Sequence, residues 1–293
     1  MIETILTSGA VLLRIISNPV GNVFQKQLTQ KGHHPLFVNF FTYFSLSLLC
    51  LAGAFFINWP LLPPSFWIYS ILGGIAGALG NGFLVRSLQM GDLSVLGPIN
   101  AYKSVISMII GLFLLHEIPN GWGLMGVALI IYGSYYVLDT GEQRFSWNIL
   151  KRAEIKLRIW AMILTAIEAV LVKKVILASS PLLGFISWCW FGALFSFLLL
   201  FFNKLQPGEQ IKKLTPAAIQ SFGLLVLCIG TMQFTTNWAF GHMPVAYALS
   251  LFQLSTIVSV LLGHRIFQEK DIRKKLIGSF IMLVGSVAII QLS

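Results

Sequence analysis

Ionisable side chains occur in the middle of long apolar runs of this 293-residue sequence. Arg14 lies within "VLLRIISNPV", Lys103 within "PINAYKSVIS" and Glu168 within "ILTAIEAVLV". A charge at the centre of a bilayer costs from about 3 to more than 10 kcal/mol, so it normally faces an opposite charge or a wet cavity. We therefore expect these three side chains to face an internal polar chamber that binds a charged solute.

Amide side chains accompany these charges at helical spacing. Asn18 follows Arg14 by four residues and Asn100 precedes Lys103 by three, so each pair shares one face of its helix. A further amide pair, four residues apart, lies in an apolar run near residue 235. The expected substrate-binding set is Arg14, Asn18, Asn100, Lys103, Glu168, Gln233 and Asn237.

The charges of this set do not balance, because two are positive and one is negative. We expect Glu168 to pair with Arg14 or Lys103 in one conformational state, which leaves one cation for an anionic or zwitterionic metabolite. Each residue also has a structural explanation. The two cations could tie helices together, the amides could bond between helices, and Lys173 and Lys174 could draw Glu168 toward water.

The composition places the chain in a membrane. Hydrophobic residues make up 56% and charged residues 10%, whereas a soluble domain has about 25% charged residues. Apolar windows of about 18 residues or more recur throughout, which predicts an all-α polytopic membrane protein. The ten expected transmembrane spans are 5–24, 36–57, 66–88, 93–115, 121–138, 157–177, 181–202, 217–239, 244–264 and 274–292.

An internal repeat relates the two halves of the chain. At an offset of 152, Ser107, Gly111, Glu117, Gly126, Gly133 and Ser134 fall on Ser259, Gly263, Glu269, Gly278, Gly285 and Ser286. Each half then holds five expected spans, and an odd number inverts the second half relative to the first. The expected organisation is a first five-helix repeat at 1–138, a charged connection at 139–156 and a second repeat at 157–293.

Two long stretches of the halves resemble a known family. They are "GDLSVLGPINAYKSVISMIIGLFLLHEIPNGWGLMGVALIIYG" (91–133) and "PVAYALSLFQLSTIVSVLLGHRIFQEKDIRKKLIGSFIMLVG" (244–285). Each has a helix with small residues, a Gly about six residues before a Glu, and then a Gly-rich helix. This pattern resembles the EamA-type repeats of the drug/metabolite transporter superfamily. The resemblance implies a ten-helix secondary transporter or exporter of small metabolites in a bacterial cytoplasmic (inner) membrane, with its site between the halves.

The Lys and Arg residues predict the orientation in the membrane. Sixteen of them fall in the connections after the odd-numbered spans or at the adjoining span ends, and two fall likewise beside the other connections. Positive residues stay in the cytoplasm, which predicts both termini outside, whereas the resemblance implies both inside. The net charge of +10 is dispersed and forms no basic stripe with exposed aromatic residues, so we expect no nucleic-acid partner.

Other motifs favour structure over catalysis. "HEIPN" (116–120) lacks the second histidine of a zinc-protease helix, His33 and His34 are adjacent in a connection, and no Walker-type loop is present. We therefore expect no enzyme activity, metal or cofactor. Glu117 and Glu269 are expected to be cap or hinge carboxylates. Close helix packing is expected at Gly73, Gly77, Gly80, Gly126, Gly133, Gly278 and Gly285.

Transport is expected to follow the solute gradient or a proton that moves through Glu168. The expected partners are the small-molecule substrate, the proton and membrane lipids. The sequence leaves open whether the chain forms a homodimer. The alternative function is a lipid-carrier flippase or accessory membrane subunit, since small-residue helix faces and basic connections suit it as well. An intramembrane enzyme is a third alternative, for which we find no convergent catalytic groups.

Overall fold

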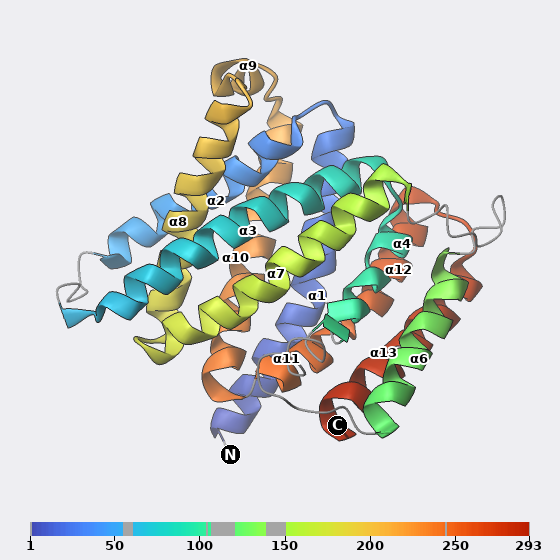
Figure 1. Ribbon diagram of the computed structural model, residues 1–293. Helices are drawn as coiled ribbons and strands as arrows, with labels where there is room; N and C mark the ends of the chain where they lie inside the picture. Colours follow the sequence, from blue (N-terminus) through green and yellow to red (C-terminus); the bar gives the residue numbers. More distant parts are fainter. Residues whose placement is uncertain are drawn as a thin grey trace.

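The computed structural model describes residues 2–54, 61–103, 105–106, 121–138, 151–243 and 245–292, and among them it contains helices and no strand (Figure 1). The elements are α1 (Ile2–Gln30), α2 (Pro35–Ala54), α3 (Pro64–Met90), α4 (Leu93–Leu96), the 3-10 helix η2 (Pro98–Ala101), α6 (Gly121–Leu138), α7 (Ala153–Leu177), α8 (Pro181–Phe202), α9 (Pro207–Lys212), α10 (Pro216–His242), α11 (Val245–Phe252), α12 (Ser255–Phe267) and α13 (Ile272–Leu292). The expected all-α class is confirmed.

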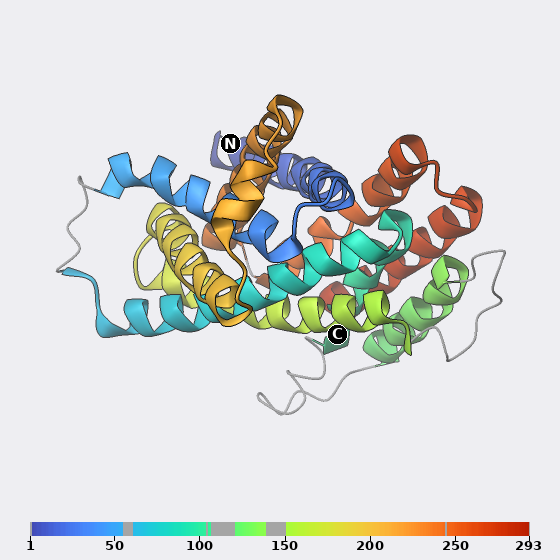
Figure 2. The same cartoon turned by 90° about the horizontal axis from the view of Figure 1, so that it is seen from above.

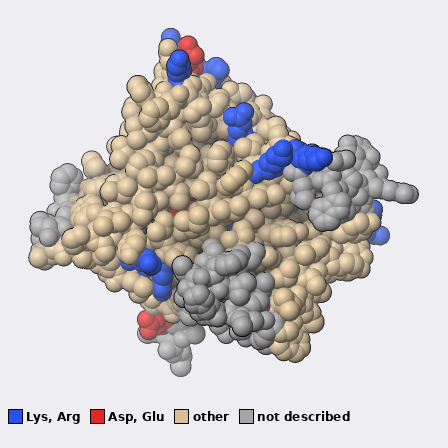
Figure 3. Space-filling model, in the orientation of Figure 1, with Lys and Arg blue, Asp and Glu red and all other residues tan. Residues whose placement is uncertain are grey.

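The outer surface is that of a protein in lipid. By length and composition, α3, α6, α8 and α10 can each cross a membrane. Large apolar side chains such as Leu49, Leu177 and Phe202 are more than two-thirds exposed. Figure 3 shows a broad uncharged surface, with Lys and Arg gathered toward the upper edge and in one patch at the lower left. Such a surface is stable where the surrounding solvent is hydrocarbon.

Most of the expected spans correspond to observed helices. The bounds of 121–138 and 181–202 match α6 and α8, whereas α1 and α10 extend several residues beyond 5–24 and 217–239. Polar residues at helix ends made these two helices look shorter in the sequence. The helix α1 begins and α13 ends at the same end of the molecule, opposite α9 (Figure 1).

Two expected spans are interrupted helices. The described part of 93–115 starts as α4, breaks at Gly97 and continues as η2, because Pro98 has no N–H for a helical bond. The stretch 244–264 divides into α11 and α12 around Gln253 and Leu254. The Gln253 Nε2 donates to the Asn100 carbonyl oxygen at 3.2 Å, so one hydrogen bond joins the two interrupted segments.

Helices from the two halves of the chain pack against each other. Figures 1 and 2 show α3 beside α7 and α6 beside α13, and α1 likewise packs along α10 and α2 against α8. Each of these pairs joins a helix before residue 139 to one after residue 152. The apolar core is therefore shared between the two halves of the chain. A central cavity lies among these helix pairs.

Glycines bring paired helices into backbone contact. A Cβ on Gly133 would lie 2.6 Å from the Gly278 carbonyl oxygen, and one on Gly285 would lie 2.6 Å from that of Gly126. Real Cβ atoms do not approach other atoms so closely, so a larger residue would separate α6 from α13. The expected use of these glycines in close packing is confirmed.

Candidate functional site

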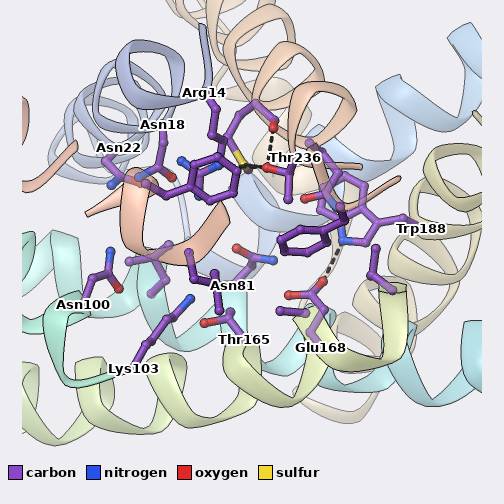
Figure 4. Close-up of a pocket in the computed structure, with 18 of the residues that line it drawn as sticks. Arg14, Asn18, Asn22, Asn81, Asn100, Lys103, Thr165, Glu168, Trp188 and Thr236 are labelled. Atoms are coloured by element: carbon purple, nitrogen blue, oxygen red, sulfur yellow. Dashed lines mark hydrogen bonds between the residues drawn. The ribbon is translucent and has the colours of Figure 1, made fainter. Parts of the chain in front are cut away.

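A polar cavity of about 90 Å³ lies at the centre of the helices (Figure 4). It is surrounded by α1, α3, η2, α7, α8, α10 and α11. Its polar lining is Arg14, Asn18, Asn22, Asn81, Asn100, Lys103, Arg158, Thr165, Glu168, Trp188, Gln233 and Thr236. All of the expected set except Asn237 therefore lies around one hollow.

Arg14 keeps part of its hydrogen-bonding capacity free. Its Nε donates to the Thr236 Oγ1 at 2.8 Å, and its guanidinium carbon lies 4.8 Å from the centre of the Phe252 ring. These contacts with α10 and α11 fix the orientation of the side chain. The Arg14 Nη1 is buried and has no hydrogen-bond partner among the described residues. An anion in the cavity could satisfy this donor.

The polar stripe on α1 is longer than expected. Asn18 and Asn22 follow Arg14 at four-residue intervals, line the same cavity and are 9% and 3% exposed. The Asn22 Oδ1 also has no partner within the described part of the chain. Asn22 is not in the expected set, although it lies within the predicted span 5–24. Continuing the spacing by one more turn would have found it.

Lys103 supplies a second cation from the segment after η2. Its side chain points into the cavity (Figure 4), and it makes no ion pair or hydrogen bond with any residue the structure describes. Asn100, three residues earlier, lines the cavity beside it. The expected shared face of this pair is therefore seen.

Glu168 is held by an aromatic donor. The Trp188 Nε1 donates to the Glu168 Oε1 at 2.6 Å, and Glu168 is 8% exposed. Gly77 on α3 makes room for this carboxylate, because a Cβ there would collide with the same oxygen. No described residue forms an ion pair with Glu168 in this structure, so its pairing with a cation in another state stays a prediction.

Trp188 both packs in the core and binds the carboxylate. Its ring packs on Tyr43, with 4.5 Å between the ring centres, and its N–H fixes the carboxylate. Nothing in the sequence pairs Trp188 with Glu168, because the two lie on different helices. Only the packing of α7 against α8 brings them together.

Arg158 is a third buried cation that the sequence reading missed. It lies at the start of the expected span 157–177 but is not in the expected binding set; α7 begins at Ala153 and leaves Arg158 3% exposed. Its Nε donates to the Leu96 carbonyl oxygen at 2.7 Å, at the end of α4, where a cation is favourable. Arg158 precedes Thr165 by seven residues, or two helical turns. This spacing was the signal in the sequence that the two residues share a face of the helix. The described lining therefore holds three cations and one carboxylate.

The amide pair on α10 divides between the cavity and the packing. The Gln233 and Asn237 side chains are hydrogen-bonded at 2.9 Å. Gln233 lines the cavity, whereas Asn237 is fully buried, lies outside its lining and reaches the Pro181 carbonyl oxygen at 3.3 Å. Asn237 thus joins α10 to the start of α8, in line with the structural alternative.

Glu269 joins three segments at the α9 end of the molecule. Its Oε1 accepts from the Lys26 Nζ at 2.8 Å and from the Leu93 N at 2.9 Å, and its Oε2 accepts from the Ser94 N at 2.8 Å. The glutamate therefore caps the start of α4, which confirms its expected role as a cap. Burial alone would raise the pKa of Glu269, but Lys26 and Ser94 outweigh burial and lower it.

Lys26 corrects the expected end of the first span. We had placed it in a connection, but α1 continues to Gln30 and buries it at 4% exposure. The partner of Glu269 in the repeat, Glu117, lies outside the described residues, as do "HEIPN" and Ser107. Among the described residues no group of three or more His, Cys, Asp or Glu could hold a metal ion.

Comparison with known proteins supports a transporter. Residues 10–138 match the model of the EamA-like transporter family. No curated protein matches the chain. One crystal structure among the matching solved structures aligns over 96% of both chains with a TM-score of 0.66 and 13% identity, which shows a shared fold. Residues 10–138 thus resemble the EamA-like transporter family, and the long apolar helices are those of an integral membrane protein.

Proposed function

We propose that this protein is a secondary transporter or exporter of small anionic or zwitterionic metabolites in a bacterial cytoplasmic membrane. The observation that carries the proposal is the charge of the cavity, where Arg14, Lys103 and Arg158 outnumber the single described carboxylate, Glu168. Buried charges normally have partners. Lys103 has none among the described residues, so an anionic solute group would supply what the protein does not.

Alternating access would come from two inverted five-helix halves, 1–138 and 157–293. The helix pairs support this arrangement. The first and third long helices of one half pack on the third and first of the other, as α1 with α10 and α3 with α7. The second helices, α2 and α8, pack on each other, as do the last, α6 and α13. A two-fold axis relating inverted halves produces this exchange.

The glycine contacts follow the same exchange. The repeat equates Gly126 with Gly278 and Gly133 with Gly285, and the close approaches are Gly133 to Gly278 and Gly126 to Gly285. Each glycine of one helix therefore contacts the equivalent of the other glycine of that helix. This is expected where two related helices pack about a two-fold axis.

In the proposed bound state, the free Arg14 Nη1 and the Lys103 ammonium contact the anionic group of the solute. Asn18, Asn22 and Asn100 offer amide groups that orient it. The carboxylate of Glu168 is the complementary partner for the amine of a zwitterion or for a coupled proton. Figure 4 shows Lys103 and Glu168 at opposite sides of the hollow, which suits a solute with separated charges.

The test begins with the solute retained by the purified protein, identified by mass spectrometry and then used in proteoliposome transport. Arg14→Gln and Lys103→Gln should each weaken binding of that solute and its transport, because each removes a cation from the cavity. Arg265→Gln is the matched control, since Arg265 is exposed. Parental affinity and transport in both cavity variants would refute the proposed site.

A lipid-carrier flippase or accessory subunit is the second candidate. An apolar groove of about 930 Å³ runs between α1, α2, α8 and α10, lined by residues such as Leu13, Leu49 and Phe234. Such a groove suits an acyl or polyprenyl chain. It shares no described lining residue with the polar cavity. A copurified anionic lipid that the protein also translocates in proteoliposomes would favour this function over metabolite transport.

A further inference from the structure

A second polar cavity, of about 300 Å³, lies at the α9 end of the molecule. The loop between α1 and α2, the last turns of α3, and α9 with the residue after it meet there. The polar side chains that line it are those of His33, His34, Arg86, Gln89, Gln210 and Lys213. None of the described residues that line it belongs to the central cavity, so it is a separate site.

Hydrogen bonds and packing hold this cavity in shape. The His34 N donates to the Oε1 of Gln210, which is 6% exposed, at 3.0 Å and so fastens the loop to α9. Gly32 makes the turn before the histidines at a φ of +93°, which favours glycine. The His33 ring packs against Phe222 on α10, with 5.4 Å between the ring centres. The histidines are therefore positioned by three elements of the fold.

The cavity is positive and lacks a described carboxylate. Arg86 and Lys213 are both exposed at its edge, and neither Asp nor Glu occurs among its described lining residues. Burial, followed by the charges of Arg86 and Lys213, lowers the pKa of His34. Burial, Lys213 and Lys31 lower the pKa of His33. Both histidines are thus neutral near pH 7 and can each donate one N–H.

One buried polar atom in this cavity has no partner in the described part of the chain. The Nδ1 of His33 makes no hydrogen bond with any residue that the structure describes, although His33 is 2% exposed. A buried polar atom without a partner costs about 1–3 kcal/mol and calls for a ligand or water. The unsatisfied histidine and the two uncompensated cations therefore favour the same kind of ligand, a small anion with several oxygen acceptors.

We propose that this cavity binds a phosphate group, either the headgroup phosphate of an anionic phospholipid or that of a soluble phosphate ester. Arg86 and Lys213 pair with the phosphate oxygens, while His33 and the Gln89 amide donate hydrogen bonds to it. Lys and Arg gather at this end of the molecule (Figure 3), which places it by the positive-inside rule against the cytoplasmic leaflet, where anionic lipids lie. The inference does not depend on which solute the central cavity carries.

The test compares nanodiscs of phosphatidylcholine alone with nanodiscs that contain phosphatidylglycerol. Native mass spectrometry counts the phosphatidylglycerol molecules retained by the full chain, and its titration gives their affinity. Arg86→Gln and Lys213→Gln should each weaken retention about tenfold, since a direct hydrogen bond to a charged group contributes about that factor. Lys212→Gln is the matched control, because it removes the same charge from α9 outside the cavity and should change retention far less.

A second arm adds inorganic phosphate to the phosphatidylcholine nanodiscs and follows thermal unfolding. Stabilisation by phosphate that Arg86→Gln and Lys213→Gln abolish, without selective lipid retention, assigns the site to a soluble phosphate ester. Lipid retention that these variants weaken and Lys212→Gln does not assigns it to the headgroup. Equal effects of all three variants, or no response in either arm, overturn the proposal. Unchanged size-exclusion profiles of the variants exclude misfolding as the cause of a loss.

Discussion

The Lys26–Glu269 ion pair should be a major stabilising contact of the structure. Its two side chains are 5% and 4% exposed, so solvent screens the pair little. Glu269→Gln would leave the Lys26 ammonium buried with a neutral amide, although the ammonium also lies 4.4 Å from the centre of the Phe267 ring. Lys26→Met would leave the carboxylate bonded to the Leu93 and Ser94 N–H groups of α4.

These partners determine the expected magnitudes. Removing one member of a buried ion pair costs about 3–5 kcal/mol in the free energy of unfolding, because the other charge stays uncompensated. We expect Glu269→Gln near the upper end of this range, since it also replaces the acceptor that caps α4. Lys26→Met should lie near the lower end, since two N–H donors still hold Glu269. The double variant should cost far less than the sum of the two single variants.

Reversible unfolding in mixed micelles of detergent and SDS measures these free energies, and the four proteins form a double-mutant cycle. Lys31→Met is the control, since Lys31 is exposed near the same end of α1 and its loss should change stability by about 0.5 kcal/mol or less. If the single effects add within about 0.5 kcal/mol, the two side chains act independently and the reasoning from their contact is wrong.

Three further predictions concern the same structure. Gly77→Ala places a Cβ against the Glu168 oxygen, so it should destabilise the protein by about 1–3 kcal/mol and impair transport; parental values of both would contradict the contact. Trp188→Phe keeps a ring but removes the donor to Glu168, so the pH profile of proteoliposome transport should shift, whereas Trp160→Phe, at an exposed position on α7, should leave it unchanged. Because the pKa of Glu269 is lowered from 4.5 in the folded state, its stabilisation is present above that value and is lost as the pH falls through the lowered pKa. An acid titration of unfolding should therefore lose this component in Glu269→Gln, and an unchanged acid profile would count against it.

The sequence was sufficient to predict the membrane class, most of the helices and much of the cavity. Arg14, Lys103 and Glu168 could be recognised because a charge inside an apolar run is costly unless it faces a polar interior. Their helical neighbours Asn18 and Asn100 followed from spacing alone. This reasoning works within one helix, where geometry fixes which residues share a face.

Contacts between helices could not be predicted in the same way. Trp188 reaches Glu168 and Thr236 reaches Arg14 through packing that no spacing in the sequence records. Lys26 and Arg158 lie near the ends of apolar runs, where charges usually meet water, so their position in the sequence does not predict burial. Their burial depends on partners elsewhere, namely Glu269 and the end of α4.

The hydrogen bond from Gln253 to the Asn100 carbonyl oxygen links the two places where the helical path is interrupted. A rotation of α11 about its interruption must therefore either drag η2 with it or sever this bond. Because Asn100 also lines the cavity, either change would move part of the cavity wall. This bond thus couples the interruption between α4 and η2 to the one between α11 and α12, so a movement of either segment is transmitted to the other.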